Sequence, residues 1–311
     1  MISGLKIPGL KRLTVTLAAC AALAGCGGPS GGGAPAKPTV LNFSILSAED
    51  QAAFQPRWTP LLDDLSKAIG VPVKPYFSSS YAALVEAMGY DQVQVGWYSA
   101  EPALETIKRA HGEVFARTVD TKGLSTYTSV LIVKKDSGVT LDRILKCDHS
   151  LAFGMGDPKS TSGTLAPMAF LFKPHKIDPN TCFKQVRNAT HDANLMAVAN
   201  GLLDGSTNNS VGLDWAQEGS ASPAAKSAFD KIKVVWTSPD LPESALVYRN
   251  DLDPDLKHKI RDFFISYGKA PGAEGERQRK ILADLHYSAF NPASDDYLQP
   301  IQQMQAAAGG S

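Results

Sequence analysis

The sequence has no excess of charge of either sign. Lys and Arg together number 31, the same as Asp and Glu, so the formal net charge is zero. Such a chain has neither the basic excess typical of nucleic-acid binding nor the acidic excess typical of disorder, so we expect no nucleic-acid partner. The six histidines include no His-x-x-x-His pair, and we predict neither a metal site nor a cofactor.

Long hydrophobic runs are also lacking, apart from one near the amino terminus. Lys11 and Arg12 precede an apolar segment, residues 13–23, that is too short for a permanent transmembrane helix. The segment ends in Leu-Ala-Gly-Cys, which resembles the bacterial lipoprotein cleavage motif. We therefore interpret residues 1–25 as a lipoprotein signal peptide and Cys26 as the lipidated residue that anchors the protein to a membrane; cleavage without lipidation is the alternative.

Cysteines are few in the rest of the chain. Residues 26–38 are rich in Gly and Pro and are interpreted as a flexible tether. Beyond Cys26 only Cys147 and Cys182 remain. An exported protein can pair these two cysteines in a disulfide, and two separate buried thiols are the alternative.

The residues after the tether, about 270 in number, suffice for one large or two medium domains. Their apolar patterns alternate between strands and helices. The first group has predicted strands at 40–46, 71–77 and 93–98, which alternate with predicted helices at 54–69, 81–88 and 102–111. After a long strand at 127–135, the second group has predicted strands at 151–154, 183–187, 233–236 and 246–248 and predicted helices at 164–172 and 191–203. The polar run 206–210 leads into another short helix, which contains Trp215, and helices follow at 254–267, 277–285 and 294–305.

This order indicates an α/β fold with two lobes. Strands separated by helices favour parallel sheets covered on both faces, with ligand sites at the carboxyl ends of the strands. Because the chain visits the second group and then returns, we predict hinge strands near residues 124–129 and 238–246. Lobe I is then residues 39–126 and 239–311, and lobe II is residues 127–238. A cleft between two such lobes is a favoured ligand site.

One stretch predicts what that ligand is. Gly156–Gly163, here called the anion socket, contains an Asp-Pro turn and then three hydroxyl residues, Ser160, Thr161 and Ser162, at the start of a predicted helix. The first N–H groups of a helix have no partner within it, and the helix dipole places positive charge there. The stretch therefore suits a phosphate-like anion without Lys or Arg, although an ordinary capped helix start is the alternative.

Several dispersed segments together resemble the periplasmic substrate-binding proteins of phosphate, phosphite and phosphonate ABC importers, in particular those for phosphonates. A set of such matches in one order is more specific than any single motif. The matching segments are residues 42–47, 58–60, 80–82, 86–88, 96–98, 126–133, 156–163, 190–200, 207–209, 241–249 and 262–268.

The resemblance implies a type II periplasmic binding-protein fold, in which two α/β domains joined by hinge strands close on a ligand and deliver it to a permease driven by an ATPase. It also implies that the phosphorus oxyanion contacts the socket hydroxyls and His191, with two tyrosines reaching in from lobe I and the hinge. The implied ligand-binding residues are Tyr81, Tyr127, Ser160, Thr161, Ser162 and His191. Trp97 and Tyr98 are equally consistent with the cleft and with the core.

Two departures from the family bear on the ligand. Relatives that bind aminoethylphosphonate have acidic residues where this sequence has Val211 and Ser244. A buried ammonium without a carboxylate is unfavourable, so we expect a smaller or neutral-tailed ligand such as phosphate, phosphite or methylphosphonate. Glu243 is one residue away and is expected to substitute only if its loop is rotated.

The sequence leaves two other functions open. A periplasmic serine hydrolase would use Ser160 or Ser162 as nucleophile and His191 as base, but no orienting acid and no Gly-x-Ser-x-Gly elbow is evident. We therefore expect the protein not to be an enzyme. A ligand-binding subunit for a receptor kinase would need the same closure around a ligand, and the sequence does not separate it from a transport protein.

Overall fold

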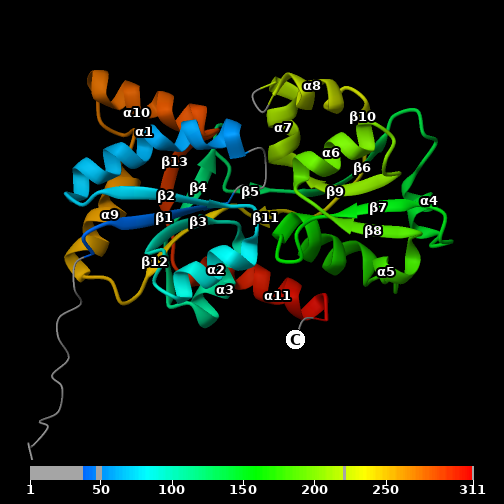
Figure 1. Ribbon diagram of the computed structural model, residues 1–311, viewed down its shortest axis with the longest axis horizontal. Helices are drawn as coiled ribbons and strands as arrows, with labels where there is room; N and C mark the ends of the chain where they lie inside the picture. The colour runs from blue at the N-terminus through cyan, green and yellow to red at the C-terminus, as the bar shows by residue number, and fades with distance from the viewer. Residues whose placement is uncertain (1–37, 47–50, 220–221, 310–311) are drawn as a thin grey trace, which may run out of the picture. The chain divides into compact units, whose positions relative to one another are not determined.

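A six-stranded sheet forms the larger layered part of the structure (Figure 1). The computed structural model describes residues 38–46, 51–219 and 222–309, so the predicted signal peptide, Cys26 and nearly all of the predicted tether lie outside the described residues. The strand order is β13-β4-β12-β3-β1-β2. The strands are β1 (Leu41–Leu46), β2 (Val73–Ser78), β3 (Val95–Tyr98), β4 (Gly112–Asp120), β12 (Ala245–Arg249) and β13 (Tyr287–Pro292).

This sheet is mixed, whereas the sequence predicted parallel pairing. Strand β1 pairs in parallel with β2 and β3, but β12 runs antiparallel to β3 and β4, and β13 runs antiparallel to β4. The prediction was incomplete because β4 and β13 were not recognised as strands.

Two groups of helices accompany this sheet. Helices α1 (Gln51–Ile69), α9 (Pro254–Ser266) and α10 (Gly272–Asp284) pack together, and α2 (Tyr81–Gly89) and α3 (Ala100–Arg109) pack on each other.

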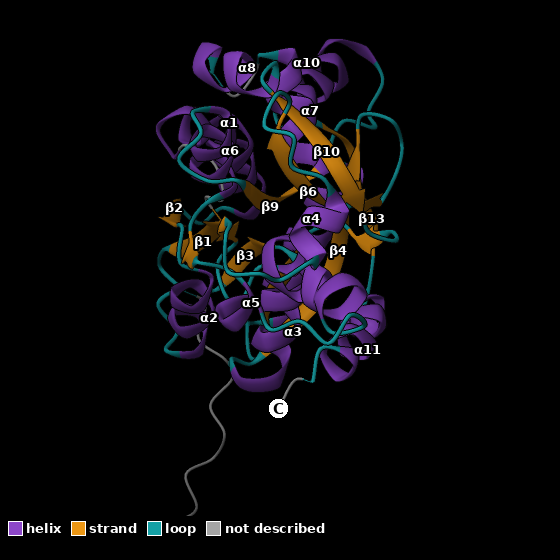
Figure 2. Cartoon of the chain, turned by 90° about the vertical axis from the view of Figure 1, so that its right-hand side faces the viewer, coloured by secondary structure: helices purple, strands orange, loops and turns teal. Residues whose placement is uncertain are grey.

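A five-stranded sheet with the order β10-β6-β9-β7-β8 forms the other part. Figure 2 shows helices on both sides of the strands. The strands are β6 (Ser129–Lys134), β7 (Ala152–Met155), β8 (Gln185–Asn188), β9 (Gly205–Asn209) and β10 (Ile232–Thr237). The helices are α4 (Leu141–Leu145), α5 (Pro179–Cys182), α6 (His191–Ala199), α7 (Ser210–Glu218), α8 (Pro223–Phe229) and two π-helical segments, η1 (Thr161–Leu165) and η2 (Met168–Phe172).

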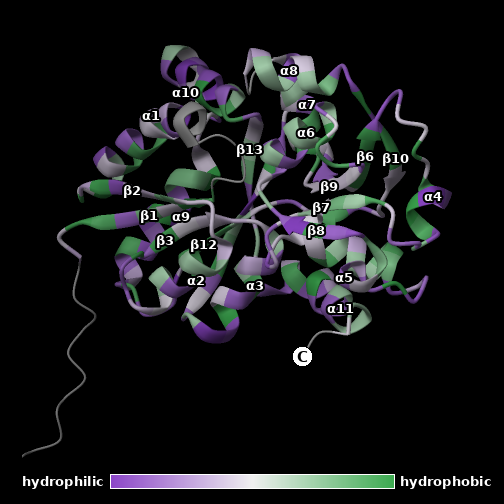
Figure 3. Ribbon diagram, turned by 45° about the vertical axis from the view of Figure 1, so that its right-hand side comes forward, coloured by the Kyte–Doolittle hydropathy of each residue, from purple (hydrophilic) through white to green (hydrophobic). Residues whose placement is uncertain are grey.

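The burial of β6 explains its unbroken apolar sequence. Val130 and Ile132 pack with the apolar residues of α6, α7 and α8, whereas Leu131 and Val133 pack on the opposite face with Phe153. A strand covered on both faces has no polar side, so its residues are apolar throughout. The edge strand β8 is partly exposed and carries the hydrophilic colour in Figure 3.

The chain passes between the two sheets through a short ribbon. Strands β5 (Thr126–Tyr127) and β11 (Leu241–Pro242) pair antiparallel, one on the outward and one on the return path. After η3 (Asp295–Leu298), the last helix, α11 (Gln299–Ala307), packs against α3 and also against η1 and η2. Elements attached to both sheets therefore meet at the carboxyl-terminal helix, within one compact unit that contains all the described residues.

A disulfide joins Cys147, which follows α4, to Cys182, the last residue of α5. This is the pairing that the sequence left open against two separate thiols. In the part of the chain that the structure describes, none of the helices has the length and hydropathy needed to cross a bilayer.

Candidate functional site

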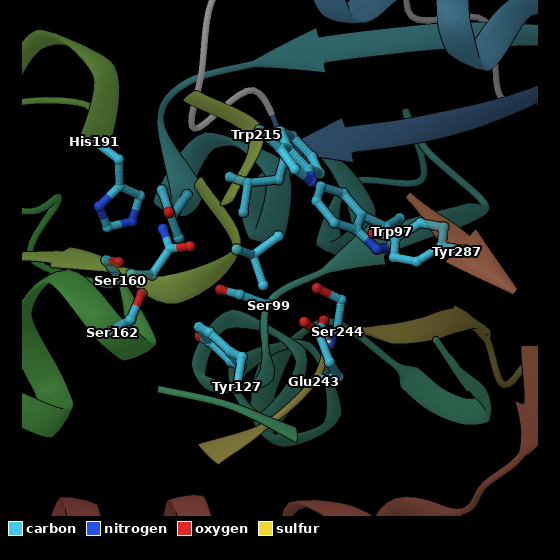
Figure 4. A pocket seen from close by; sticks show the side chains of 14 residues that line it. Trp97, Ser99, Tyr127, Ser160, Ser162, His191, Trp215, Glu243, Ser244 and Tyr287 are labelled. Carbon is cyan, nitrogen blue, oxygen red and sulfur yellow. Dashed lines mark hydrogen bonds between the residues drawn. The ribbon is translucent and has the colours of Figure 1, made fainter. Parts of the chain in front are cut away.

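A cavity of about 50 Å³ lies where elements of the two sheets meet. Figure 4 shows Ser160, Ser162 and His191 on one side of this cavity and Glu243 and Ser244 on the other. The lining consists of Leu46, Tyr81, Trp97, Ser99, Tyr127, Ser160, Ser162, His191, Asn209, Val211, Trp215, Glu243, Ser244 and Tyr287.

Five helix beginnings converge on this cavity. Each follows a strand, so the carboxyl ends of strands from both sheets point toward it, as expected for α/β sheets. The lining residues at these beginnings are Tyr81 of α2, the α3 cap Ser99, the η1 cap Ser160, His191 of α6 and the α7 cap Asn209. None of the fourteen lining residues is Lys or Arg. Helix dipoles and the N–H groups of the first helical turns therefore supply the positive potential of the described lining.

The anion socket adopts a wider turn than the sequence predicted. Ser160 Oγ accepts a hydrogen bond from Gly163 N at 3.0 Å, and the Ser160 carbonyl accepts one from Leu165 N at 3.0 Å. The second bond spans five residues, which is the π-helical spacing, whereas a regular helix was expected. Such turns occur frequently at functional sites. The N–H groups of Thr161 and Ser162 precede the internal bonds of this turn and are the donors it offers to an anion.

Side chains of strands β6 and β9 form hydrogen bonds with the backbone of the socket. Ser129 Oγ donates to the Ser162 carbonyl at 2.6 Å, and Thr207 Oγ1 donates to the Gly163 carbonyl at 2.7 Å. Thr207 Oγ1 also accepts from Gly156 N at 3.1 Å. The sequence analysis missed these supporting residues because β9, Gly-Ser-Thr-Asn-Asn, is entirely polar and reads as a loop, although all five residues are buried. Its place between two predicted helices was the available signal for a strand.

His191 is buried beside the socket as the first residue of α6. Thr190 Oγ1 caps this helix by accepting from Ala193 N at 3.3 Å, and Asn208 Nδ2 donates to the His191 carbonyl at 3.0 Å. Burial lowers the pKa of His191 to about 4, so the imidazole is neutral at pH 7. A neutral imidazole offers one N–H donor to a ligand.

Five of the six residues predicted to bind the ligand line the cavity together, namely Tyr81, Tyr127, Ser160, Ser162 and His191. Thr161 is not in the lining, because its Oγ1 accepts a hydrogen bond from Glu101 N of α3 at 2.8 Å. A contribution of the Thr161 backbone N–H to the ligand stays a prediction.

The two aromatic residues at the end of β3 differ from each other. Trp97 lines the cavity, whereas Tyr98 is fully buried in the core. Ser44 Oγ donates to the Tyr98 hydroxyl at 2.7 Å, and the hydroxyl lies 3.3 Å from its acceptor, the Leu84 carbonyl. Sequence reasoning also missed five lining residues, Leu46, Ser99, Asn209, Trp215 and Tyr287. Leu46 and Asn209 lie in segments that resemble the family, but neither residue was assigned to the ligand.

Val211 and Ser244, the two positions that the sequence marked as departures from the family, both line the cavity. Glu243 lines the cavity as well. That it would replace the missing acids only with a rotated loop stays a prediction. Its Oε2 accepts from Ser244 N at 2.8 Å and from Thr118 Oγ1 at 3.2 Å. Burial raises the pKa of Glu243, which favours the neutral carboxyl.

Comparison with known proteins gives consistent results. Residues 43–298 match the family model described as "ABC transporter, phosphonate, periplasmic substrate-binding protein". The chain is 40% identical to the phosphonates-binding periplasmic protein of Escherichia coli K12 over 266 residues, which cover 85% of this chain and 75% of that protein.

Solved structures show the same fold. The crystal structure of a binding protein component of a phosphonate ABC transporter from Pseudomonas aeruginosa has a TM-score of 0.81 at 39% identity, covering 87% of this chain and 86% of that one. A protein from Prochlorococcus marinus in complex with methylphosphonate has a TM-score of 0.73 at 18% identity, covering 88% of this chain and 100% of that one.

Proposed function

We propose that this chain, which belongs to the family of phosphonate-binding periplasmic substrate-binding proteins of ABC transporters, binds a small phosphorus oxyanion in the cavity between its two sheets. The observation that carries the proposal is the convergence of five helix beginnings on a cavity whose lining, in the described part of the chain, includes neither Lys nor Arg. Neutral hydroxyls, a neutral imidazole and unpaired N–H groups supply donors on several sides of a compact anion.

The size of the cavity favours a small ligand. The cavity leaves only about 50 Å³ for the centres of water-sized groups, so it suits a compact ligand. A tetrahedral anion with at most a short substituent matches this space. A nucleotide does not.

The lining opposite the socket favours a ligand without an amine. Val211 and Ser244 carry no charge, and Glu243 is buried with a raised pKa and uses Oε2 for two hydrogen bonds. A buried ammonium needs an ionised carboxylate as partner, and this environment disfavours the ionised form of Glu243. Phosphate, phosphite, methylphosphonate or another phosphonate without an amine is therefore the proposed ligand class.

Capture and delivery follow from the two-part architecture. We propose that residues 39–126 and 239–311 form lobe I and residues 127–238 form lobe II, and that these lobes close on the ligand about the β5–β11 ribbon. The closed form then delivers the anion to a permease and its ATPase. We further propose that residues 1–25 are removed as a lipoprotein signal, that Cys26 carries the lipid, and that residues 26–38 tether the protein to a membrane of the cell envelope.

A binding role also accounts for His191 better than a hydrolase does. In a serine hydrolase, the second nitrogen of the base is bonded to an orienting acid. Among the described residues His191 Nδ1 has no hydrogen-bond partner, and the pKa of His191 is lowered to about 4, too low for a general base near neutral pH.

Calorimetric titration of the mature protein with phosphate, phosphite, methylphosphonate and 2-aminoethylphosphonate tests the proposal. We expect saturable binding of at least one of the three ligands without an amine. No binding of any of the four would refute the proposed function, and tight binding of the amino compound alone would refute the proposed ligand class.

A further inference from the structure

The anion socket is fastened to α3 through Glu101. This residue follows Ser99 and Ala100 at the start of α3, on the side of the six-stranded sheet, whereas the socket belongs to the five-stranded sheet. Glu101 N donates to Thr161 Oγ1 at 2.8 Å, between the two serines of the socket that line the cavity. One backbone hydrogen bond therefore joins the two parts directly behind the anion site.

The Glu101 side chain lies in the same contact and is only 6% exposed. Its Oε1 is 3.6 Å from Lys159 Nζ, and Lys159 directly precedes Ser160. Gln305 Nε2 of α11 donates to Oε1 at 3.3 Å. Oε2 is buried without a partner among the described residues. A buried carboxylate with one unbonded oxygen is costly, and protonation relieves that cost.

The charged groups around Glu101 oppose one another. Lys159 favours the ionised form, and Glu105, one turn along α3, disfavours it. Glu105 in turn lies 3.5 Å from Lys159 Nζ and 3.2 Å from Arg109 Nε. From α11 the contacting group is the neutral Gln305, whose Oε1 accepts from Lys108 Nζ. Burial is the largest influence and raises the pKa of Glu101 to about 7.

The other neighbours of α3 place their acids elsewhere. Glu86 of α2 shares a surface hollow with Arg109, at the opposite end of α3 from Glu101. Asp295 of η3 accepts a hydrogen bond from Val114 N. Lys159 and Glu105 are therefore the charges that act on Glu101 most directly.

We propose that Glu101 is a positioning residue of the anion site, which holds the socket against α3 in the closed protein and takes up one proton when the anion is enclosed. The inference rests on the proposed function, since it requires that the two parts close on a ligand. Parting them would remove Lys159 and Thr161 from Glu101 and admit water to its carboxyl group. The carboxyl would then return toward its ordinary pKa of 4.5.

The direction of the pH effect follows from this difference. Between pH 4.5 and 7 the closed form holds a proton on Glu101 that the open form lacks, so closure is favoured as the pH falls. This advantage is complete below the ordinary pKa and is lost as the pH rises through the pKa of the closed form. For a closed-form pKa of about 7, the affinity for the anion rises about tenfold from pH 8 to pH 6.

The test compares the mature protein with Glu101→Gln by calorimetry with methylphosphonate at pH 6, 7 and 8. Glutamine keeps the shape of the side chain and is always neutral, and the titration of the ligand itself affects both proteins equally. We expect the ratio of wild-type to variant affinity to rise about tenfold from pH 8 to pH 6. Glu105→Gln is the matched control, because it also contacts Lys159 but is expected to keep most of the wild-type slope.

Parallel pH profiles for the wild type and Glu101→Gln would overturn the inference and leave the proposed function intact. Absence of binding of every phosphorus anion by either protein would refute the proposed function and this inference with it. If Glu101→Gln does not fold, carboxyl NMR of the wild type replaces it. One Glu signal is then expected to titrate near pH 7 with ligand and near pH 4.5 without it, and unchanged titration of every Glu would contradict the inference.

Discussion

Gly163 lies so close to His191 that a Cβ atom at position 163 would be 3.2 Å from His191 Cε1. The same atom would be 2.7 Å from the Cα of Gly156, at the other end of the socket. Two backbone segments and an imidazole ring are thus in contact with no side chain between them. The socket and the helix that begins at His191 can approach each other this closely because residue 163 has no side chain.

Gly163→Ala is therefore expected to displace the socket from His191. The shortest contact, 2.7 Å, would be with backbone of Gly156, which yields less readily than a flexible side chain, and a second, 2.9 Å, would be with Ser160 Oγ. We therefore expect about tenfold weaker ligand binding or more, together with lower stability. Gly89→Ala in α2 is the control, because its Cβ would meet ordinary contacts of 3.6 Å and alanine is the better helix former. Calorimetry and thermal unfolding measure both effects, and unchanged affinity in Gly163→Ala would contradict the close approach.

Ser162→Ala and His191→Ala are each expected to weaken anion binding without unfolding the protein. The loss of one buried donor costs about 1–3 kcal/mol, which corresponds to about 5- to 150-fold in Kd. Ser137→Ala and His258→Ala make the same changes at exposed positions outside the cavity lining and are expected to bind normally. If both cavity variants bind as tightly as the wild type, these two residues do not belong to the site.

Val211→Glu is expected to change the preference of the cavity. A carboxylate at this lining position gives an ammonium a partner, whereas it is an uncompensated charge beside a neutral tail. The affinity ratio of 2-aminoethylphosphonate to methylphosphonate should rise about tenfold or more. Val211→Gln, whose side chain has the shape of glutamate without its charge, should leave this ratio unchanged. A wild type that already prefers the amino compound, and loses that preference in Glu243→Gln, would identify Glu243 as the ammonium acceptor and contradict our ligand class.

Removal of the disulfide is expected to lower stability without altering the site. The bridge closes a loop of 35 residues, which on the chain-entropy model stabilises the folded state by about 3–4 kcal/mol. Denaturant unfolding of the Cys147→Ser/Cys182→Ser double variant measures this loss. Neither cysteine lines the cavity, so the affinity for the anion should stay the same. Equal stability of the variant and the wild type would show that the bridge contributes nothing.

The sequence predicted the regular part of the fold because its signals are local. Strand β6 is an apolar run covered on both faces, and α2 and α6 begin at residues whose caps, Ser80 and Thr190, are visible in the sequence. The five cavity-lining residues among the six predicted were found through the resemblance to a known family, since spacing alone does not bring Tyr81 to His191.

What the sequence did not predict depends on tertiary contacts. Strand β9 is polar because Thr207 donates a hydrogen bond to the socket and Asn208 donates one to the His191 carbonyl. The strand is therefore buried by these polar contacts, and its sequence shows no apolar pattern. Thr161 has the same hydroxyl as its neighbours, and its orientation toward Glu101 follows only from the packing of α3. Strands β4 and β13 were not predicted because each contains polar residues that interrupt the apolar pattern.

A crystal structure of the protein grown with methylphosphonate tests the central claim most directly. We predict density for a tetrahedral anion in the cavity, with its oxygen atoms about 2.7–3.2 Å from Ser160, Ser162 and a ring nitrogen of His191. An anion bound elsewhere while this cavity holds only solvent would contradict the account.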